Sequence, residues 1–172
     1  IVTLSGDLGN DLHVYHVVTG SGTDHTAVLD GFTITGGQAI GSGVDEYYGG
    51  GVFNLFGSPL LQNVIVSSNS ATTGGGGMYN NHSNPRLIHV VFNGNTVTAG
   101  FGGGMQNHYS DPDLFNVTFS GNSVLDGGGG AMYNDQCSPT LMNVTFVNNS
   151  ATGGNGGAMY NDGSYGGGSR PR

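Results

Sequence analysis

The feature that most restricts how this chain can fold is a short glycine-rich string that returns at a nearly constant interval. The fullest copies read Gly-Gly-Ala-Met-Tyr-Asn at 129–134 and again at 156–161. Less regular copies precede them, and the numbers of the closing asparagines differ by 26, 27, 27 and 27 in turn: Asn54, Asn80, Asn107, Asn134 and Asn161. A fixed period in this range predicts a solenoid, in which each repeat buries its apolar side by stacking on its neighbours.

Other positions repeat at the same interval. Apolar series predict the core, and they comprise Leu61, Leu87, Leu114, Leu141, Val64, Val90, Val117, Val144, Phe92, Phe119 and Phe146. A second asparagine series consists of Asn69, Asn95, Asn122 and Asn149. We expect both asparagine series to form ladders of side-chain amides that hydrogen-bond along the stack, as in cross-β assemblies.

Each repeat predicts three short strands separated by turns. In the best copy the strands are expected at 132–134, 139–142 and 144–147, the last with period-two alternation. Asn143 stands between the second and third strands, where a sharp bend needs left-handed backbone angles that asparagine tolerates. The chain is therefore predicted to be all-β: a right-handed, single-stranded parallel β-helix with about 27 residues per coil and roughly five to six coils.

We expect one β-helix segment over 1–172. Residues 49–172 hold the regular repeats, and residues 1–48 form irregular entry coils with a protruding loop near 40–48. Both ends are predicted to stop within a repeat, because residues 169–172 align with 137–140 and the strands that would follow are missing. Free solenoids end in polar capping repeats, and neither end shows one. This predicts end-to-end stacking on copies of the chain, or a place in a longer array.

Composition excludes several classes. The chain has 11 acidic residues against three basic ones and a net charge of -8, so it offers nucleic acid no basic surface. No apolar run approaches the ~20 residues of a membrane span, and nothing at Ile1 resembles a signal peptide. The one cysteine, Cys137, excludes an internal disulfide framework.

Two paired motifs, Gly-Gly-Ala/Gly-aliphatic and Phe-x-x-Asn, recur along the chain. They stand at 129–132 with 146–149; the first recurs at 156–159, and the second at 92–95 and 119–122. With these motifs the chain resembles the secreted right-handed β-helix repeat proteins of bacteria, which are related to polymorphic outer-membrane adhesins and autotransporter passengers. The resemblance implies an extracellular or cell-surface location, with adhesion as the usual role.

An aromatic row is the candidate ligand-binding surface. One position beyond the inward-facing Val or Met of each first strand, period-two geometry turns the next side chain outward. These side chains are Phe53, Tyr79, Tyr133 and Tyr160, with Gln106 in the middle of the row. An exposed row of aromatic rings can stack against sugar rings, which predicts binding of extracellular glycans. The competing interpretation is structural, with stacked rings that contribute roughly 0.2–1 kcal/mol per pair.

Two acidic turns are candidate Ca²⁺ sites, although the fold requires no cofactor. Asp135 and Asp162 are expected in adjacent coils, where their carboxylates would repel by about 1 kcal/mol in water. A bound Ca²⁺ would cancel that repulsion with oxygen ligands, and solvent screening is the alternative. Asp7 and Asp11 form the second acidic turn.

Polysaccharide lyases and hydrolases also use the parallel β-helix. A lyase needs a basic side chain beside a Ca²⁺ ion that acidic residues hold. Arg86 has no such acid cluster in neighbouring coils, where the equivalent positions are Leu60, Asp113 and Thr140. A hydrolase needs carboxylates about 5–9.5 Å apart, which only Asp135 with Asp162 approaches. We therefore predict a structural or adhesive extracellular module, such as a stalk or fibre segment, rather than an enzyme. A carbohydrate-binding module is the second hypothesis and a polysaccharide-cleaving enzyme the third.

Overall fold

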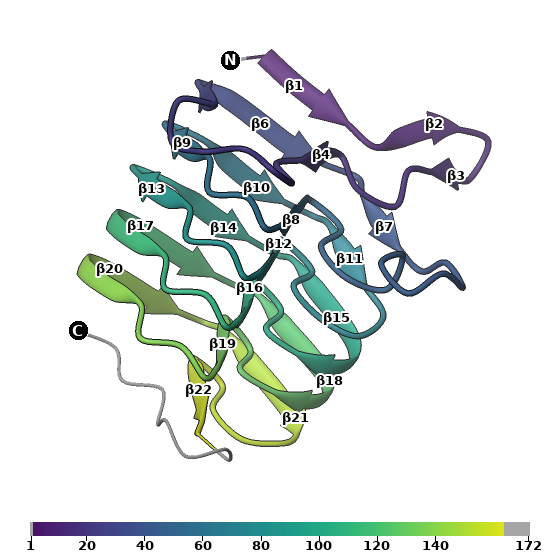
Figure 1. The fold of residues 1–172 in the computed structure, drawn as a ribbon. Helices are drawn as coiled ribbons and strands as arrows, with labels where there is room; N and C mark the ends of the chain where they lie inside the picture. Colours follow the sequence, from purple (N-terminus) through teal and green to yellow (C-terminus); the bar gives the residue numbers. More distant parts are fainter. Residues whose placement is uncertain (1, 164–172) are drawn as a thin grey trace.

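The computed structural model describes residues 2–163, and within this range the chain consists of strands and turns without a helix (Figure 1). The strands stack into a parallel β-solenoid of about six turns with about 27 residues per turn, which confirms the predicted fold class. A helix long and apolar enough to cross a membrane is consequently missing from residues 2–163.

Three parallel sheets run along the solenoid, and we number them by their order within a repeat. The first sheet contains β4 (Val18–Thr19), β8 (Val52–Leu55), β12 (Met78–Asn81), β16 (Met105–His108), β19 (Met132–Asp135) and β22 (Met159–Asp162). The second contains β1 (Val2–Ser5), β5 (Val28–Asp30), β6 (Phe32–Thr35), β9 (Leu60–Gln62), β10 (Ile65–Ser67), β13 (Arg86–Ile88), β14 (Val91–Asn93), β17 (Asp113–Ser120) and β20 (Thr140–Val147). The third contains β7 (Gln38–Ala39), β11 (Ser70–Ala71), β15 (Thr96–Phe101), β18 (Ser123–Gly128) and β21 (Ser150–Gly153).

Neighbouring coils pair in the register that the sequence period predicts. In the second sheet Leu87 pairs with Leu114, and Leu114 pairs with Leu141. Paired strands lie about 4.8 Å apart, so equivalent side chains stand one above another in a common file. Every ladder in the sequence is a consequence of this stacking.

Inward-facing apolar side chains fill the solenoid. The rings of Phe92 and Phe119 stack with centroids 4.7 Å apart, and those of Phe119 and Phe146 with centroids 5.1 Å apart. Most of the predicted core is buried, namely Leu61, Leu87, Leu114, Val64, Val90, Val117, Phe92 and Phe119. The predicted core residues of β20 are only partly buried, because no further strand of the described chain stacks on β20: Leu141, Val144 and Phe146.

The first asparagine ladder runs through the interior beside the first sheet. The Nδ2 of Asn54 donates to Oδ1 of Asn80 at 2.8 Å. The same bond, at the same distance, joins the later members of the ladder: Asn80 to Asn107, Asn107 to Asn134, and Asn134 to Asn161. Each amide therefore satisfies the next one, and from Asn54 to Asn134 the side chains are fully buried.

The second asparagine ladder closes the turn between the second and third sheets. The Oδ1 of Asn95 accepts from both the backbone N–H and the Nδ2 of Asn69, at 3.1 Å each. The pattern continues from Asn95 to Asn122 and from Asn122 to Asn149. The Nδ2 of Asn95 also donates to the carbonyl of Val66 at 2.9 Å. The Asn95 side chain thus accepts from the backbone of the preceding coil through its oxygen and donates to that backbone through its nitrogen.

The predicted bend lies at a left-handed residue in each of four coils. The φ angles lie between 53° and 56° at Asn63, His89, Asn116 and Asn143. In the last two of these coils the pairing continues through the bend. The expected second and third strands of each coil therefore form one continuous strand, β17 in the first of these coils and β20 in the second. The bend therefore changes the direction of the chain without ending the sheet.

The prediction of three strands per repeat is incomplete, because it lacks the third sheet. Its inward side chains are small, and they pack as a separate buried file of Ala39, Ala71, Val97 and Val124. The segments around them are rich in Ser, Thr, Ala and Gly. Gly and Ala are depleted in strands and weaken the signal of the Thr and Val residues beside them, so pairing with neighbouring coils decides that these segments become strands.

The segment before the regular repeats, 2–48, has a less uniform structure than they have. β2 (Asp7–Gly9) and β3 (Leu12–His13) form an antiparallel hairpin that the sequence analysis did not predict. In the part expected to protrude, the Glu46 carboxylate accepts from the backbone N–H groups of Ser42 and Gly43 at 2.9 and 2.8 Å. Val44 at its tip is exposed. The predicted truncation at 169–172 lies outside the described residues.

Candidate functional site

The predicted aromatic row lies on the outward side of the first sheet, but its expected exposure is wrong. Phe53, Tyr79 and Tyr133 are only 5%, 7% and 5% exposed, and Tyr160 is half-buried. The strand alternation does turn these side chains away from the core. Other side chains then cover them, so the row is an outer layer of packing rather than a free face.

The covering rings come from the preceding coil. Tyr48 stacks on Tyr79 with ring centroids 4.5 Å apart, and Phe101 stacks on Tyr133 at 4.3 Å. His16 stacks on Phe53 at 4.7 Å. Burial, reinforced by nearby anionic groups, raises the pKa of Tyr79 and of Tyr133 well above the ordinary range of a phenol. Both phenols therefore stay protonated well into the alkaline range.

A cleft opens where Gln106 interrupts the aromatic row. Its volume is about 250 Å³, and it lies between the Tyr48–Tyr79 pair and the Phe101–Tyr133 pair. Gln106 is 8% exposed, and its Oε1 atom has no hydrogen-bond partner. Thr73, His108 and Asp135 complete the lining. The cleft combines aromatic walls with a few convergent polar groups, the usual make-up of a small-molecule site.

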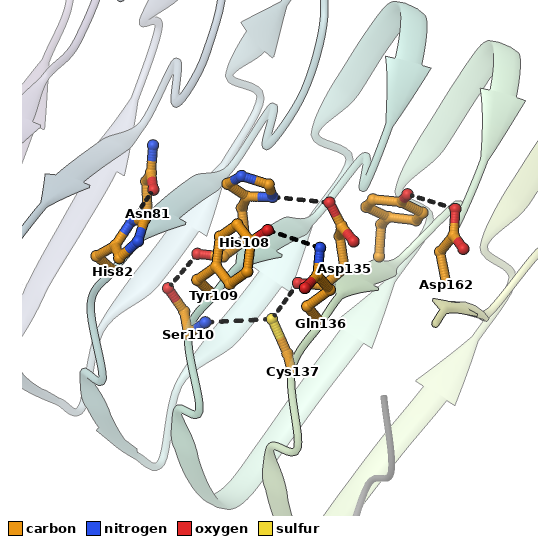
Figure 2. Close-up of polar contacts among 10 residues, drawn as sticks. Asn81, His82, His108, Tyr109, Ser110, Asp135, Gln136, Cys137 and Asp162 are labelled. Carbon is orange, nitrogen blue, oxygen red and sulfur yellow. Dashed lines mark hydrogen bonds and ion pairs between the residues drawn. The ribbon is translucent and has the colours of Figure 1, made fainter. Parts of the chain in front are cut away.

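A polar strip follows the first sheet, where each strand runs into the next turn (Figure 2). The Nδ1 of His108 lies 2.7 Å from Oδ2 of Asp135 in the next coil. The Tyr133 hydroxyl donates to Oδ2 of Asp162 at 3.2 Å, again across one coil. Each of the two carboxylates thus accepts from a different residue of the preceding coil, Asp135 from His108 and Asp162 from Tyr133.

The acidic turns do not gather a metal-ligand set. Among residues 2–163, no group of three or more His, Cys, Asp or Glu side chains is placed to hold a metal ion. At the other candidate turn, the Asp7 carboxylate accepts from the backbone N–H of Gly9 at 2.7 Å. Asp11 is in the left-handed region with φ of 61°. In this structure Asp7 therefore stabilises the β2–β3 hairpin turn.

The sequence analysis missed an exposed row that directly follows the first sheet. Its members share a left-handed backbone with φ between 47° and 54°; Phe56, His82 and Tyr109 are exposed and Gln136 is half-buried. Phe56 is 66% and Tyr109 45% exposed. The His82 ring lies 5.1 Å from each of these two rings. The regular interval between these positions was visible in the sequence, but the change of residue type concealed the row.

Cys137 and Arg86 both have structural surroundings. The Cys137 thiol is buried; it donates to the carbonyl of Asp135 at 2.9 Å and accepts from the N–H of Ser110 at 3.2 Å. Burial raises its pKa to about 12, which opposes formation of a reactive thiolate. The Arg86 guanidinium lies 5.2 Å from the centroid of the Phe115 ring, a cation–π contact.

No protein-family model, curated protein or solved structure matches this chain significantly. The resemblance to secreted β-helix proteins therefore depends on the repeat motifs alone. The parallel β-solenoid itself follows from the structure.

Proposed function

We propose that this chain is a structural rod module of a secreted or surface-exposed protein, with an adhesive outer surface. The observation that carries the proposal is continuity. Each of the three sheets is a series of parallel pairs from coil to coil, and two amide ladders follow the same axis. A pull along the axis is shared by all of these bonds at each coil boundary, which suits a stalk or fibre.

The exposed row of Phe56, His82 and Tyr109 supports the adhesive part of the proposal. Aromatic residues are enriched where proteins bind one another, and here the rigid backbone of a solenoid presents them one coil apart. The Gly-Gly-Ala/Gly-aliphatic and Phe-x-x-Asn motifs support a place outside the cell through their resemblance to secreted β-helix proteins.

Surface labelling tests this proposal. Antibodies raised against the chain are applied to intact and to permeabilised cells that produce the protein, and bound antibody is located by immunogold electron microscopy. We expect label on intact cells or on fibres extending from them. Label that appears only after permeabilisation would overturn the proposal.

We also propose that copies of the chain stack end to end. Within residues 2–163, β1 pairs only with β6 and β20 pairs only with β17, so each has one edge without a neighbouring strand. Free strand edges pair readily with other strands. Light scattering over a hundredfold concentration range should show mass rising with concentration, and Val144→Lys, which places an inward-pointing charge on the β20 edge, should suppress it. A constant monomer mass would contradict stacking.

A further inference from the structure

We infer that the cleft over Gln106 binds one uncharged sugar residue. It lies on the outward side of the first sheet, midway along the buried aromatic row. The inference is independent of the rod proposal, because a rod without this ligand remains a rod. It also differs from the glycan surface expected from the sequence, which required exposed rings rather than a gap between covered ones.

The gap arises because two positions that hold aromatic residues in neighbouring coils, one at the corner and one in the first sheet, hold other residues here. Tyr48, Gly74 and Phe101 pair in successive coils, and Tyr48 and Phe101 each place a ring over the tyrosine of the next coil. Gly74 has no side chain to place over the next coil, and the residue there is Gln106. Neither position supplies a ring, so the aromatic layer is open between Tyr79 and Tyr133.

The floor of the cleft holds an unsatisfied amide. A Cβ built on Gly74 would lie 1.5 Å from Oε1 of Gln106, so the Gln106 side chain extends across Gly74 into space that only glycine leaves free. Buried polar atoms are almost always hydrogen-bonded, and an exception calls for an explanation. The terminal amide torsion of glutamine is broad, so a modest rotation turns the amide toward a hydroxyl in the cleft.

The rim favours a ligand with several hydroxyl groups and no negative charge. Asp135 uses Oδ2 to accept from His108, and a carboxylate has room for further donors. Thr73 adds a hydroxyl that can donate or accept. The carboxylate and the net charge of -8 both repel anions. Hydroxyl donors for Gln106 and Asp135, with C–H faces against aromatic walls, describe a neutral sugar.

The size of the cleft limits the ligand to a single ring. Drug-sized ligands occupy pockets of about 300–1,000 Å³, and this cleft measures about 250 Å³. A longer glycan would therefore place one residue between the aromatic pairs and extend its remaining residues into solvent.

Ligand-observed NMR tests the inference with defined probes. Methyl glycosides of glucose, galactose and N-acetylglucosamine are added in excess to the whole chain, and saturation transfer from protein to sugar is measured. Methyl glucuronide is the charged counterpart. We expect transfer to at least one neutral glycoside and weaker transfer to the glucuronide. Absence of transfer to all three neutral probes, or stronger transfer to the glucuronide, would overturn the inference.

Variants of Gln106 locate the site. Gln106→Tyr places a ring in the gap and should abolish transfer without loss of folding, because Tyr160 already lies against an equivalent glycine, Gly128. Gln106→Met keeps the size of the side chain without its amide and should weaken binding about tenfold, the effect of one lost hydrogen bond. The control Met142→Ala, at an exposed position of the second sheet outside the cleft, should bind as the wild type does. Phe56→Ala tests the exposed row instead.

The outcomes separate this inference from the rod proposal. Transfer that persists unchanged in Gln106→Tyr, while circular dichroism shows the same fold, would place the sugar elsewhere and refute the site. Surface labelling would be unaffected by that result. Loss of transfer in Phe56→Ala together with its persistence in Gln106→Tyr would move binding to the exposed row, which also refutes the site.

Discussion

The interior of the first asparagine ladder should be far more sensitive to truncation than its first member. Asn80 is fully buried, accepts from Asn54 and donates to Asn107, each at 2.8 Å. Asn80→Ala leaves the Nδ2 of Asn54 and the Oδ1 of Asn107 buried without partners. An orphaned buried polar group costs about 1–3 kcal/mol, so the two together lower the free energy of unfolding by about 2–6 kcal/mol.

Asn54→Ala is the matched control, because it removes the same side chain from an equally buried position. The Oδ1 of Asn54 has no partner in the native protein. Removing this side chain orphans the Oδ1 of Asn80 but also eliminates an atom that was already unpaired. The number of unpaired groups stays the same, and the volume removed equals that in Asn80→Ala. The difference between the variants therefore isolates the ladder bonds.

Urea unfolding followed by far-ultraviolet circular dichroism measures the comparison. We expect similar urea dependence for both variants and the wild type, with a clearly lower transition midpoint for Asn80→Ala than for Asn54→Ala. Equal midpoints for the two variants would refute the reasoning, since the effect would then be one of lost volume rather than of unsatisfied amides.

Three further predictions concern the buried thiol, the two covered phenols and one left-handed bend. Cys137 should resist thiol reagents at about pH 8 in the folded protein and react fully in urea, because its raised pKa and burial suppress the thiolate; rapid reaction of folded protein would contradict this. The raised pKa values of Tyr79 and Tyr133 stabilise the fold fully below the ordinary phenol pKa of about 10 and progressively less above it, as the unfolded phenols ionise. The urea midpoint should therefore fall at alkaline pH, and less so in the doubly substituted Tyr→Phe variant; an equal fall in both would exclude these phenols. Asn116→Val should be less stable than Asn116→Gly by at least about 1–2 kcal/mol, because valine has a Cβ that opposes the left-handed bend; equal stabilities would show that the bend relaxes.

The local chemistry of the repeat explains which elements were predictable. The bend at Asn143 and the file of Leu87, Leu114 and Leu141 follow from residue preference and period, and the structure has both. The strand at Ser150–Gly153 was missed, because it contains Ala151 and Gly153, which are depleted in strands, and shows no apolar alternation. It forms because its backbone pairs with β18 of the preceding coil, and this pairing depends on residues outside the segment.

The candidate site shows a similar division. Strand alternation correctly turns Tyr79 and Tyr133 away from the core, but alternation describes a strand and not what covers it. Each covering ring precedes the tyrosine that it covers by more than one period of the repeat, as Tyr48 precedes Tyr79 and Phe101 precedes Tyr133. The reason is that the covering ring stands at the corner before the first-sheet strand of the preceding coil. Since this offset does not match the period, the covering contact does not appear in the sequence as a ladder. The cleft over Gln106 depends on that same contact.

By itself, the sequence determined the solenoid, its period and its asparagine ladders, because in-register stacking places like residues over like and so writes the fold into the sequence as a repeat. Only the tertiary structure decided which outward side chains reach solvent. Exposure depends on which corner side chains of one coil pack over the first sheet of the next coil. That packing is set by contacts between coils rather than by the conformational preference of any single residue.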